Sequence, residues 1–281
     1  SSELLLQSGL DRVIFTGCGE MGREVMRSAA QRLTPVTLEL GGKDPFIVLQ
    51  DADLERAVRC AVWGSFVNAG QTCAGVKRIY VQKDIFDRFS QSMARQTSAL
   101  KLGWGWEDPD VSVGPMISEV ALKEVEVMVS NALQGGARVL VGGRRHPNLQ
   151  GHFFEPTILV DAWQDMDVVQ KELFGPVVTI MPFGDEDEAL ELARDCRFAL
   201  NASIWTRDIE RGRRLAERLP GGTAVLNNSP YTFGLGETPW GGSGESGFGR
   251  THGHLGLLDL VEMHHVHWDS GRYAQDIWWS P

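Results

Sequence analysis

Two residues in glycine-rich surroundings carry side chains suited to covalent chemistry. Cys73 lies in the sequence NAGQTCAG (residues 68–75), whose small side chains would leave the sulfur accessible. Backbone N–H groups in such a loop can stabilise a thiolate or an oxyanion. A cysteine is more commonly a small apolar core residue, but the glycine-rich loop favours a nucleophile at Cys73.

Glu39 is the second candidate, and it lies in the apolar sequence VTLELGGK (residues 36–43) just before a glycine pair. In an alternating strand this carboxylate would usually face solvent. At the carboxyl end of a strand in an α/β sheet, however, it would stand where such sheets place ligands. Burial there would raise the pKa of Glu39 toward that of a useful general base.

Two further motifs are weaker signals. The sequence FTGCGEMG (residues 15–22) follows an apolar run and opens a helical pattern, so its glycines and free helix N–H groups could hold a phosphate. Its spacing is not GxGxxG, and glycine-containing turns of this kind occur in many folds. The sequence KELFGP (residues 171–176) is by itself only a turn with a flanking carboxylate, Glu172.

The composition excludes several classes of protein. With 281 residues, 42% of them hydrophobic, the chain can bury a core. Its formal net charge of −10 argues against a nucleic-acid partner and against docking on anionic lipid. No apolar run is long enough to span a bilayer, and the N-terminus lacks the pattern of a secretory signal. Four cysteines without a CxxC pair indicate free thiols in a cytoplasmic protein.

Alternating strands and helices must position these candidate residues. Strands are predicted at residues 10–16, 36–40, 46–49, 78–81, 138–141, 153–160, 177–183, 202–205 and 224–226. Helices are predicted at residues 20–33, 51–67, 85–100, 118–133, 186–194 and 209–219. This alternation is typical of βαβ units on a largely parallel sheet, so the predicted fold class is α/β.

Taken in order, the motifs resemble those of the aldehyde dehydrogenase superfamily of NAD(P)-dependent enzymes. They are FTG followed by GEMG, then LELGGK, NAGQTCAG, KELFGPV and PWGGSGESGFGR, and the resemblance extends from about residue 10 to about residue 261. The separation of Glu39 and Cys73 along the chain also fits this family. Several motifs in a fixed order are much more specific than any one of them.

The resemblance implies a division of labour between the two candidate residues. Cys73 would attack the aldehyde carbonyl as a thiolate, and hydride transfer to NAD or NADP would leave a thioester. Glu39 would activate the water that hydrolyses this thioester. The same resemblance implies a set of residues at the cofactor: Gly17, Cys18, Gly22, the backbone of Leu40, Glu172 and Phe174.

The resemblance also implies an aldehyde dehydrogenase-like catalytic domain with a parallel sheet over residues 41–242. Residues 1–40 would be the remnant of a Rossmann-type cofactor domain, and residues 243–281 a return segment followed by an oligomerisation strand and a tail. Family members are much longer, so a preceding part would hold the first βαβ units and an oxyanion-hole asparagine. The full-length form would be a homo-oligomer that acts on a small-molecule aldehyde, without nucleic acid or membrane.

Two other functions stay open. An enzyme that transfers the thioester to CoA or phosphate is disfavoured by Glu39, because a hydrolytic base favours water. A non-catalytic fragment that acts by assembly would fit the absence of an N-terminal half. The sequence leaves the aldehyde and the choice between NAD and NADP undecided, although Tyr231 and Phe233 indicate an apolar or aromatic mouth to the substrate tunnel.

Three histidines near the C-terminus, His264, His265 and His267, invite the interpretation of a metal site. The sequence VEMHHVHW (residues 261–268) instead favours a strand with His265 and His267 on one face. In the family such a strand pairs across an oligomer interface. We therefore predict no metal site there and expect Trp278 and Trp279 to form a packing tail.

Overall fold

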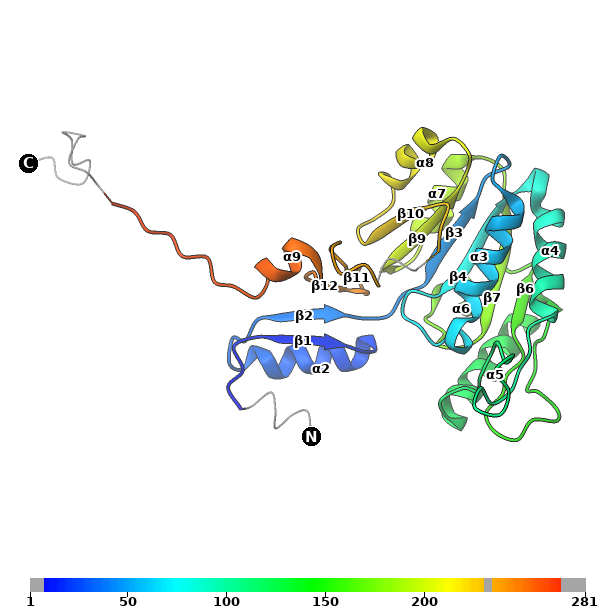
Figure 1. Cartoon of the computed structure of the whole chain (residues 1–281), viewed down its shortest axis with the longest axis horizontal. Coiled ribbons are helices and arrows are strands. Elements are labelled where there is room, and N and C mark those ends of the chain that lie inside the picture. Colours follow the sequence, from blue (N-terminus) through cyan, green and yellow to red (C-terminus); the bar gives the residue numbers. More distant parts are fainter. Residues whose placement is uncertain (1–7, 230–233, 269–281) are drawn as a thin grey trace, which may run out of the picture.

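The structure, a computed structural model, describes residues 8–229 and 234–268. The strands in these residues form a seven-stranded sheet, a separate three-stranded sheet and a two-stranded ladder. Figure 1 shows the larger sheet flanked by helices and the smaller sheet beside it, joined by the chain that runs from β2 into β3. Strands and helices alternate, and the predicted α/β class is confirmed.

The large sheet has the strand order β10-β9-β3-β4-β7-β6-β5. Neighbouring strands pair in parallel except β5, which runs antiparallel to β6 at one edge. The inner strand β3 is buried along its whole length, as expected where helices cover both faces of a parallel sheet. The bounds are β3 (Asp44–Val48), β4 (Val76–Gln82), β5 (Arg138–Val141), β6 (Thr157–Val160), β7 (Val177–Phe183), β9 (Asn201–Trp205) and β10 (Thr223–Leu226).

Helices cover both faces of this sheet. Side chains alternate along a strand, so Phe46 and Val48 of β3 join one core and Ile47 joins the other. Asp53 and Ser118 fix two helix starts, since each side chain accepts a hydrogen bond from a first-turn backbone N–H. The helices of one face are α3 (Leu54–Phe66) and α4 (Phe86–Ser98), and those of the other are α5 (Glu119–Gln134), α6 (Asp167–Gln170), α7 (Glu186–Arg194) and α8 (Ile209–Ala216).

The small sheet joins segments from both ends of the chain. Strand β1 (Val13–Thr16) pairs in parallel with β2 (Val36–Glu39), and the connection between them holds α2 (Gly19–Ala30). Strand β12 (Gly247–Phe248) returns to pair antiparallel with β2. The close approach requires glycine, because Gly247 has φ +105° and a Cβ there would lie 1.9 Å from the carbonyl oxygen of Leu38.

The domain boundaries near residues 40 and 242 stay a prediction. The returning segment also contacts the large part of the molecule, because β11 (Ser243–Gly244) pairs with β8 (Phe198–Ala199). Helix α9 (Gly253–Leu258) follows β12. The end of β2, where Glu39 lies, is thereby covered by a segment from far along the chain.

One predicted strand is shorter than expected. The apolar run at residues 153–160 forms β6 only from Thr157 onward. Phe154 instead makes an isolated bridge with Arg145, and the ring of Phe153 packs edge-on against Trp104 at 5.1 Å between centroids. The apolar side chains of this run therefore anchor a loop as well as a strand.

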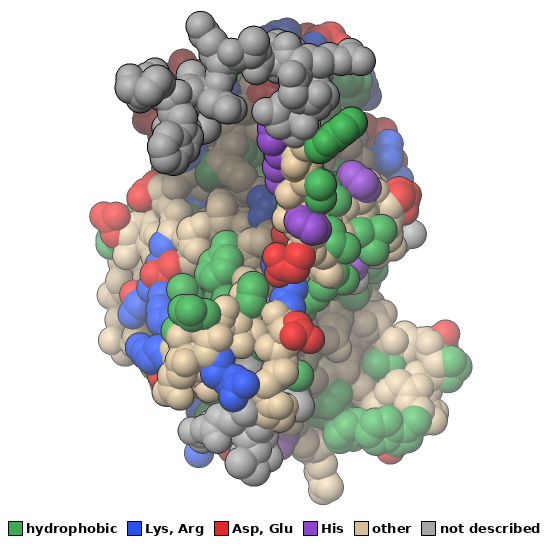
Figure 2. Space-filling view, turned by 90° about the vertical axis from the view of Figure 1, so that its left-hand side faces the viewer, with side chains coloured by type: hydrophobic (Ala, Val, Ile, Leu, Met, Phe, Trp, Pro, Cys, Tyr) green, Lys and Arg blue, Asp and Glu red, His purple; other side chains and the backbone are tan. Residues whose placement is uncertain are grey.

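The described part of the C-terminal segment forms no strand within this chain. Residues 261–268 are extended and exposed, and the rings of His265 and His267 stack with centroids 6.3 Å apart. Figure 2 shows hydrophobic and histidine side chains close together toward this end of the molecule. Pairing with a second subunit stays a prediction for this segment, and Trp278 and Trp279 lie outside the described residues.

Between residues 8 and 268, apart from the gap at 230–233, no helix has the length and apolar character needed to cross a membrane. The same part of the chain contains no group of three His, Cys, Asp or Glu side chains arranged to hold a metal ion.

Candidate active site

A cavity of about 430 Å³ collects most of the residues selected from the sequence. Its lining consists of Thr16, Gly17, Cys18, Glu39, Leu40, Cys73, Glu124, Glu172 and Phe174. Gly22 is the one predicted cofactor residue that does not line it. Gly22 instead lets α2 pack on the small sheet, since a Cβ there would lie 2.7 Å from Cδ2 of Leu40.

The loop that carries Cys73 has a strained backbone. After α3, a 3₁₀ turn, η1 (Val67–Gly70), holds Asn68 and Ala69 at φ +51° and +54°, a region that residues with a side chain rarely adopt. The side-chain amide of Asn68 donates to the carbonyl of Gln71 at 2.9 Å, and the side-chain amide of Gln71 donates back to the carbonyl of Asn68 at 3.1 Å. These bonds fix the turn that leads to Cys73.

The thiol of Cys73 is partly buried against Ala74, Leu200 and Trp240. Burial raises the pKa of this thiol, and the nearby carboxyl of Asp44 raises it further. The backbone N–H groups of Ala74 and of Cys73 itself act in the opposite direction, because they donate toward the sulfur. The resting group is therefore a thiol, and its surroundings already contain donors for a negative charge.

Glu39 is buried rather than facing solvent, with only 7% of its surface exposed. Burial raises the pKa of its carboxyl, while hydrogen bonds from Thr251 and Trp240 and the positive charge of Arg250 oppose the shift. The Thr251 hydroxyl donates to Oε1 of Glu39 at 3.0 Å. A carboxylate held in this way can accept a proton more readily than an exposed one.

Thr251 and Trp240 were not predicted as site residues. They lie opposite each other in a backbone bridge, where each N–H donates to the other's carbonyl at 2.7 and 2.8 Å. The sequence signal was the PWGGSGESGFGR motif, whose glycines predict a tight backbone but do not reveal which side chain meets Glu39.

Glu172 lies against the glycine pair that follows Glu39. A Cβ on Gly41 would lie 1.9 Å from Oε1 of Glu172, so only glycine admits this carboxyl. Burial raises the pKa of Glu172, and the charges of Lys43 and Lys77 together with the N–H of Gly42 oppose the shift. The KELFGP turn thus presents its carboxyl at the wall of the cavity.

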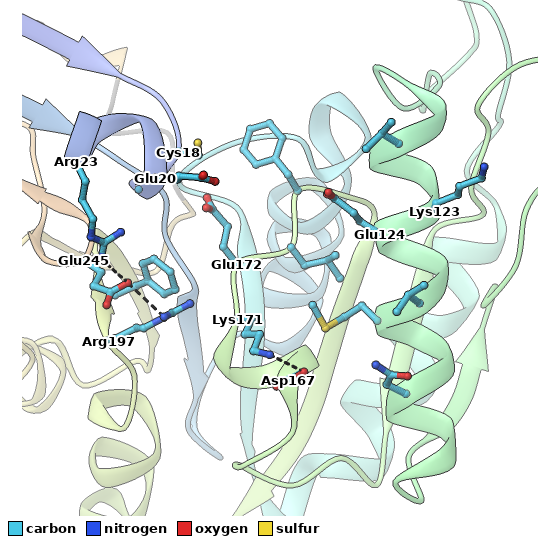
Figure 3. A pocket seen from close by; sticks show the side chains of 18 residues that line it. Cys18, Glu20, Arg23, Lys123, Glu124, Asp167, Lys171, Glu172, Arg197 and Glu245 are labelled. Atoms are coloured by element: carbon cyan, nitrogen blue, oxygen red, sulfur yellow. Dashed lines mark hydrogen bonds and ion pairs between the residues drawn. The ribbon is translucent and has the colours of Figure 1, made fainter. Parts of the chain in front are cut away.

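A larger groove of about 750 Å³ adjoins this cavity. Cys18, Glu124, Glu172 and Phe174 line both spaces. Figure 3 looks into the groove, with side chains of α2 on one side, side chains of α5 on the other and Glu172 between them. Cys73 lines only the smaller of these two spaces.

A comparison with protein families agrees with the order of these motifs in the chain. The model of the aldehyde dehydrogenase family matches residues 1–266, nearly the whole chain. The chain belongs to the aldehyde dehydrogenase family. The resemblance inferred from the sequence is confirmed.

Individual relatives agree with this family. The chain is 40% identical over 269 residues to the betaine aldehyde dehydrogenase of Bacillus subtilis (strain 168), covering 94% of this chain and 54% of that protein. It is 42% identical over 252 residues to the 3-sulfolactaldehyde dehydrogenase of Pseudomonas putida, covering 90% and 51%. The chain therefore spans about half the length of these curated relatives.

A solved structure shows the same fold. The betaine aldehyde dehydrogenase of Staphylococcus aureus, in complex with NAD+, matches with a TM-score of 0.89 at 36% identity. The match covers 98% of this chain and 55% of that one. The described sheets are thus arranged as in a family member that binds NAD+.

Proposed function

We propose that this chain supplies the nucleophile and the hydrolytic base of an NAD(P)-dependent aldehyde dehydrogenase, which oxidises an aldehyde to a carboxylic acid. The observation that carries the proposal is that Cys73, Glu39 and Glu172 line one cavity of about 430 Å³. These residues come from three segments that are separate in the sequence. A cavity of this size suits a small ligand.

Cys73 is the nucleophile in this proposal. Its thiol proton must leave as the sulfur attacks the aldehyde carbon, because burial keeps the resting group protonated. In this proposal that proton passes to water in the cavity, and Glu39, a buried carboxylate on the same cavity, acts only in the hydrolytic step. The N–H groups of Cys73 and Ala74 would donate to the oxyanion of the resulting thiohemiacetal.

Hydrolysis of the thioester is the second task. Glu39 removes a proton from a water molecule, whose oxygen attacks the thioester carbonyl. The carbon–sulfur bond then breaks, the carboxylic acid leaves, and the proton returns the sulfur of Cys73 to its thiol form. Thr251 holds Glu39 for this step through the hydrogen bond at Oε1.

The residues around the cavity fit an NAD(P) cofactor, which when bound would accept the hydride. Glu172 offers a carboxyl for the nicotinamide ribose hydroxyls, and Phe174 stands beside it on the same turn. Gly17 and Cys18 precede the N-terminus of α2, whose free N–H groups suit a phosphate. The NAD+ complex of the related betaine aldehyde dehydrogenase supports this assignment.

The alternative functions are less well supported. A buried Glu39 with its own hydrogen-bond donor favours transfer of the acyl group to water rather than to CoA. A purely structural fragment would have no need for a cysteine and a tuned carboxylate on one cavity. We further propose that the complete enzyme is a cytoplasmic homo-oligomer whose C-terminal strand near residues 261–268 pairs between subunits.

The test is NADH formation with a panel of aldehydes, measured on this chain and on the chain joined to an N-terminal half from a related enzyme. In the form that turns over, Cys73→Ala should abolish NADH formation. Glu39→Gln should keep a first burst of NADH and lose steady turnover, because acylation precedes hydrolysis. Loss of the burst in both variants alike would contradict the roles assigned to these residues.

A further inference from the structure

Lys77 is a buried lysine that the proposed chemistry does not use. It lies on β4 shortly after Cys73, and only 3% of its surface is exposed. Its Nζ donates to the carbonyl oxygen of Gly70 at 2.7 Å and to that of Gly175 at 2.6 Å. One carbonyl belongs to the nucleophile loop and the other to the KELFGP turn, so a single amine joins the two segments.

The two segments are in close contact at this point. A Cβ on Gly70 would lie 2.2 Å from the carbonyl oxygen of Gly175 and 2.9 Å from Nζ of Lys77. On its other side, Gly175 packs against α5, since a Cβ there would lie 2.4 Å from Cγ2 of Val125. Two carbonyl oxygens that converge in a buried place repel each other unless a donor stands between them, and Lys77 is that donor.

We propose that Lys77 is a positioning residue that clasps the loop of Cys73 to the turn of Glu172 and Phe174. The clasp makes the nucleophile and the cofactor turn move as one unit. Its meaning for catalysis rests on the proposed function, whereas the clasp itself is a property of the folded chain.

The charges around Lys77 make the clasp sensitive to pH. Burial lowers the pKa of Lys77 to about 7, and the carboxyls of Glu172 and Asp44 oppose the shift. Lys43 also interacts with Lys77, and burial lowers the pKa of Lys43 well below its usual value; Arg78 acts on the neighbouring Lys43 and Asp44. Because charge-assisted hydrogen bonds are stronger than neutral ones, the clasp holds best below that pKa and loosens as pH rises through it.

The rate at which iodoacetamide alkylates Cys73, measured by peptide mass spectrometry on the intact chain, tests the clasp. The exposed thiol of Cys18 serves as the internal reference. Below the pKa of Lys77, the Lys77→Met variant should expose Cys73 and raise its alkylation rate about tenfold, as expected when a hydrogen bond from a charged group is lost. Lys101→Met, at a partly exposed lysine paired with Asp108, is the matched control and should leave the Cys73 rate unchanged.

The wild-type chain provides an independent measurement. Its ratio of Cys73 to Cys18 alkylation should step upward as pH passes about 7, and this step should be absent from Lys77→Met. A Cys73 rate that is unchanged by the substitution, or a wild-type ratio without the step, would overturn the proposal. So would an equal rise at Cys60, a partly buried thiol on α3, because it would report general unfolding.

The test depends neither on the folding of one variant nor on catalytic turnover. If Lys77→Met does not fold, Lys77→Gln keeps two N–H donors without the charge, and the wild-type pH series needs no substitution at all. Alkylation also requires no turnover. A chain that shows the step near neutral pH but forms no NADH would support the clasp and contradict the proposed function. A chain that forms NADH but shows no step would support the proposed function and contradict the clasp.

Discussion

The hydroxyl of Thr251 donates a hydrogen bond to Oε1 of Glu39 across 3.0 Å, although 212 positions separate the two residues in the chain. Strand β12 makes this possible, because it brings the returning segment onto β2 just before Thr251. The environment of the proposed base is thus built by residues from opposite ends of the described chain.

Replacing Thr251 tests this contact. The donated hydrogen bond lowers the pKa of Glu39, so Thr251→Val should raise it further and favour the protonated carboxyl. The bond contributes stability when Glu39 is charged, and this contribution is lost as pH falls through the folded-state pKa. Urea unfolding should show a loss of about 1 kcal/mol above that pKa and almost none well below it.

The control for this prediction is Thr251→Ser, which keeps the hydroxyl and removes one methyl group. Its stability should follow the wild type at both ends of the pH series. A Val variant that loses the same stability at every pH would show that Thr251 acts through packing alone.

Asp44 should influence the pKa of Cys73, the proposed nucleophile. This carboxyl is buried, which raises its own pKa well above the usual value, and Oδ1 accepts a hydrogen bond from the backbone N–H of Asn201 at 3.2 Å. In its charged form it raises the pKa of Cys73. Asp44→Asn should therefore lower the pKa of Cys73 and shift its alkylation curve to lower pH. Asp87→Asn, at an exposed position on α4, should leave the curve in place. A curve that does not move in Asp44→Asn would exclude this electrostatic link.

Gly70→Ala should destabilise the fold around the nucleophile. Gly70 has φ +67°, and its new Cβ would meet backbone atoms of Gly175, which cannot swing aside as a side chain can. The left-handed conformation alone costs about 1–2 kcal/mol for alanine. Thermal unfolding should detect the loss, with Gly105→Ala as the control because a Cβ at Gly105 meets no atom within 4 Å. Equal melting temperatures in the two variants would refute the close contact.

Gly41→Ala should act on the cofactor rather than on stability. The Cβ would collide with the carboxyl of Glu172, the end of a flexible side chain that can rotate away. We therefore expect little change in the free energy of unfolding but weaker binding of NAD(P), measured by titration in whichever form of the enzyme binds it. Gly114→Ala meets no neighbour and should bind as the wild type does. Unchanged affinity in Gly41→Ala would argue against Glu172 as a cofactor residue.

The strands and helices were largely predictable because their signals are local. Apolar runs predicted the buried strands near Phe46 and Ile79, and apolar periodicity predicted the helix that starts at Leu54. The strand predicted at residues 153–160 was too long at its start, because Phe153 lies in a loop and packs on Trp104 rather than in a strand. Periodicity does not distinguish a core strand from an apolar anchor.

The residues of the candidate site were also predictable only where their signals are local in the sequence. Cys73, Glu39 and Glu172 could be selected because each lies in a motif whose neighbours are adjacent in sequence. Gly22 was placed with the cofactor residues, which stays a prediction, and in the structure it also makes room for Leu40. Its role depends on a strand that packs across from it, which no local pattern reports.

The sequence by itself determined which residue types carry the chemistry and which backbone segments present them. Only the tertiary structure decided the electrostatic state of those residues, because desolvation and hydrogen bonding depend on groups that are distant in the chain. Thr251 reaches Glu39, and Lys77 joins Gly70 to Gly175, solely because the sheets bring their strands together. Local motifs specify reactive groups, whereas long-range packing sets their pKa values and holds them in place.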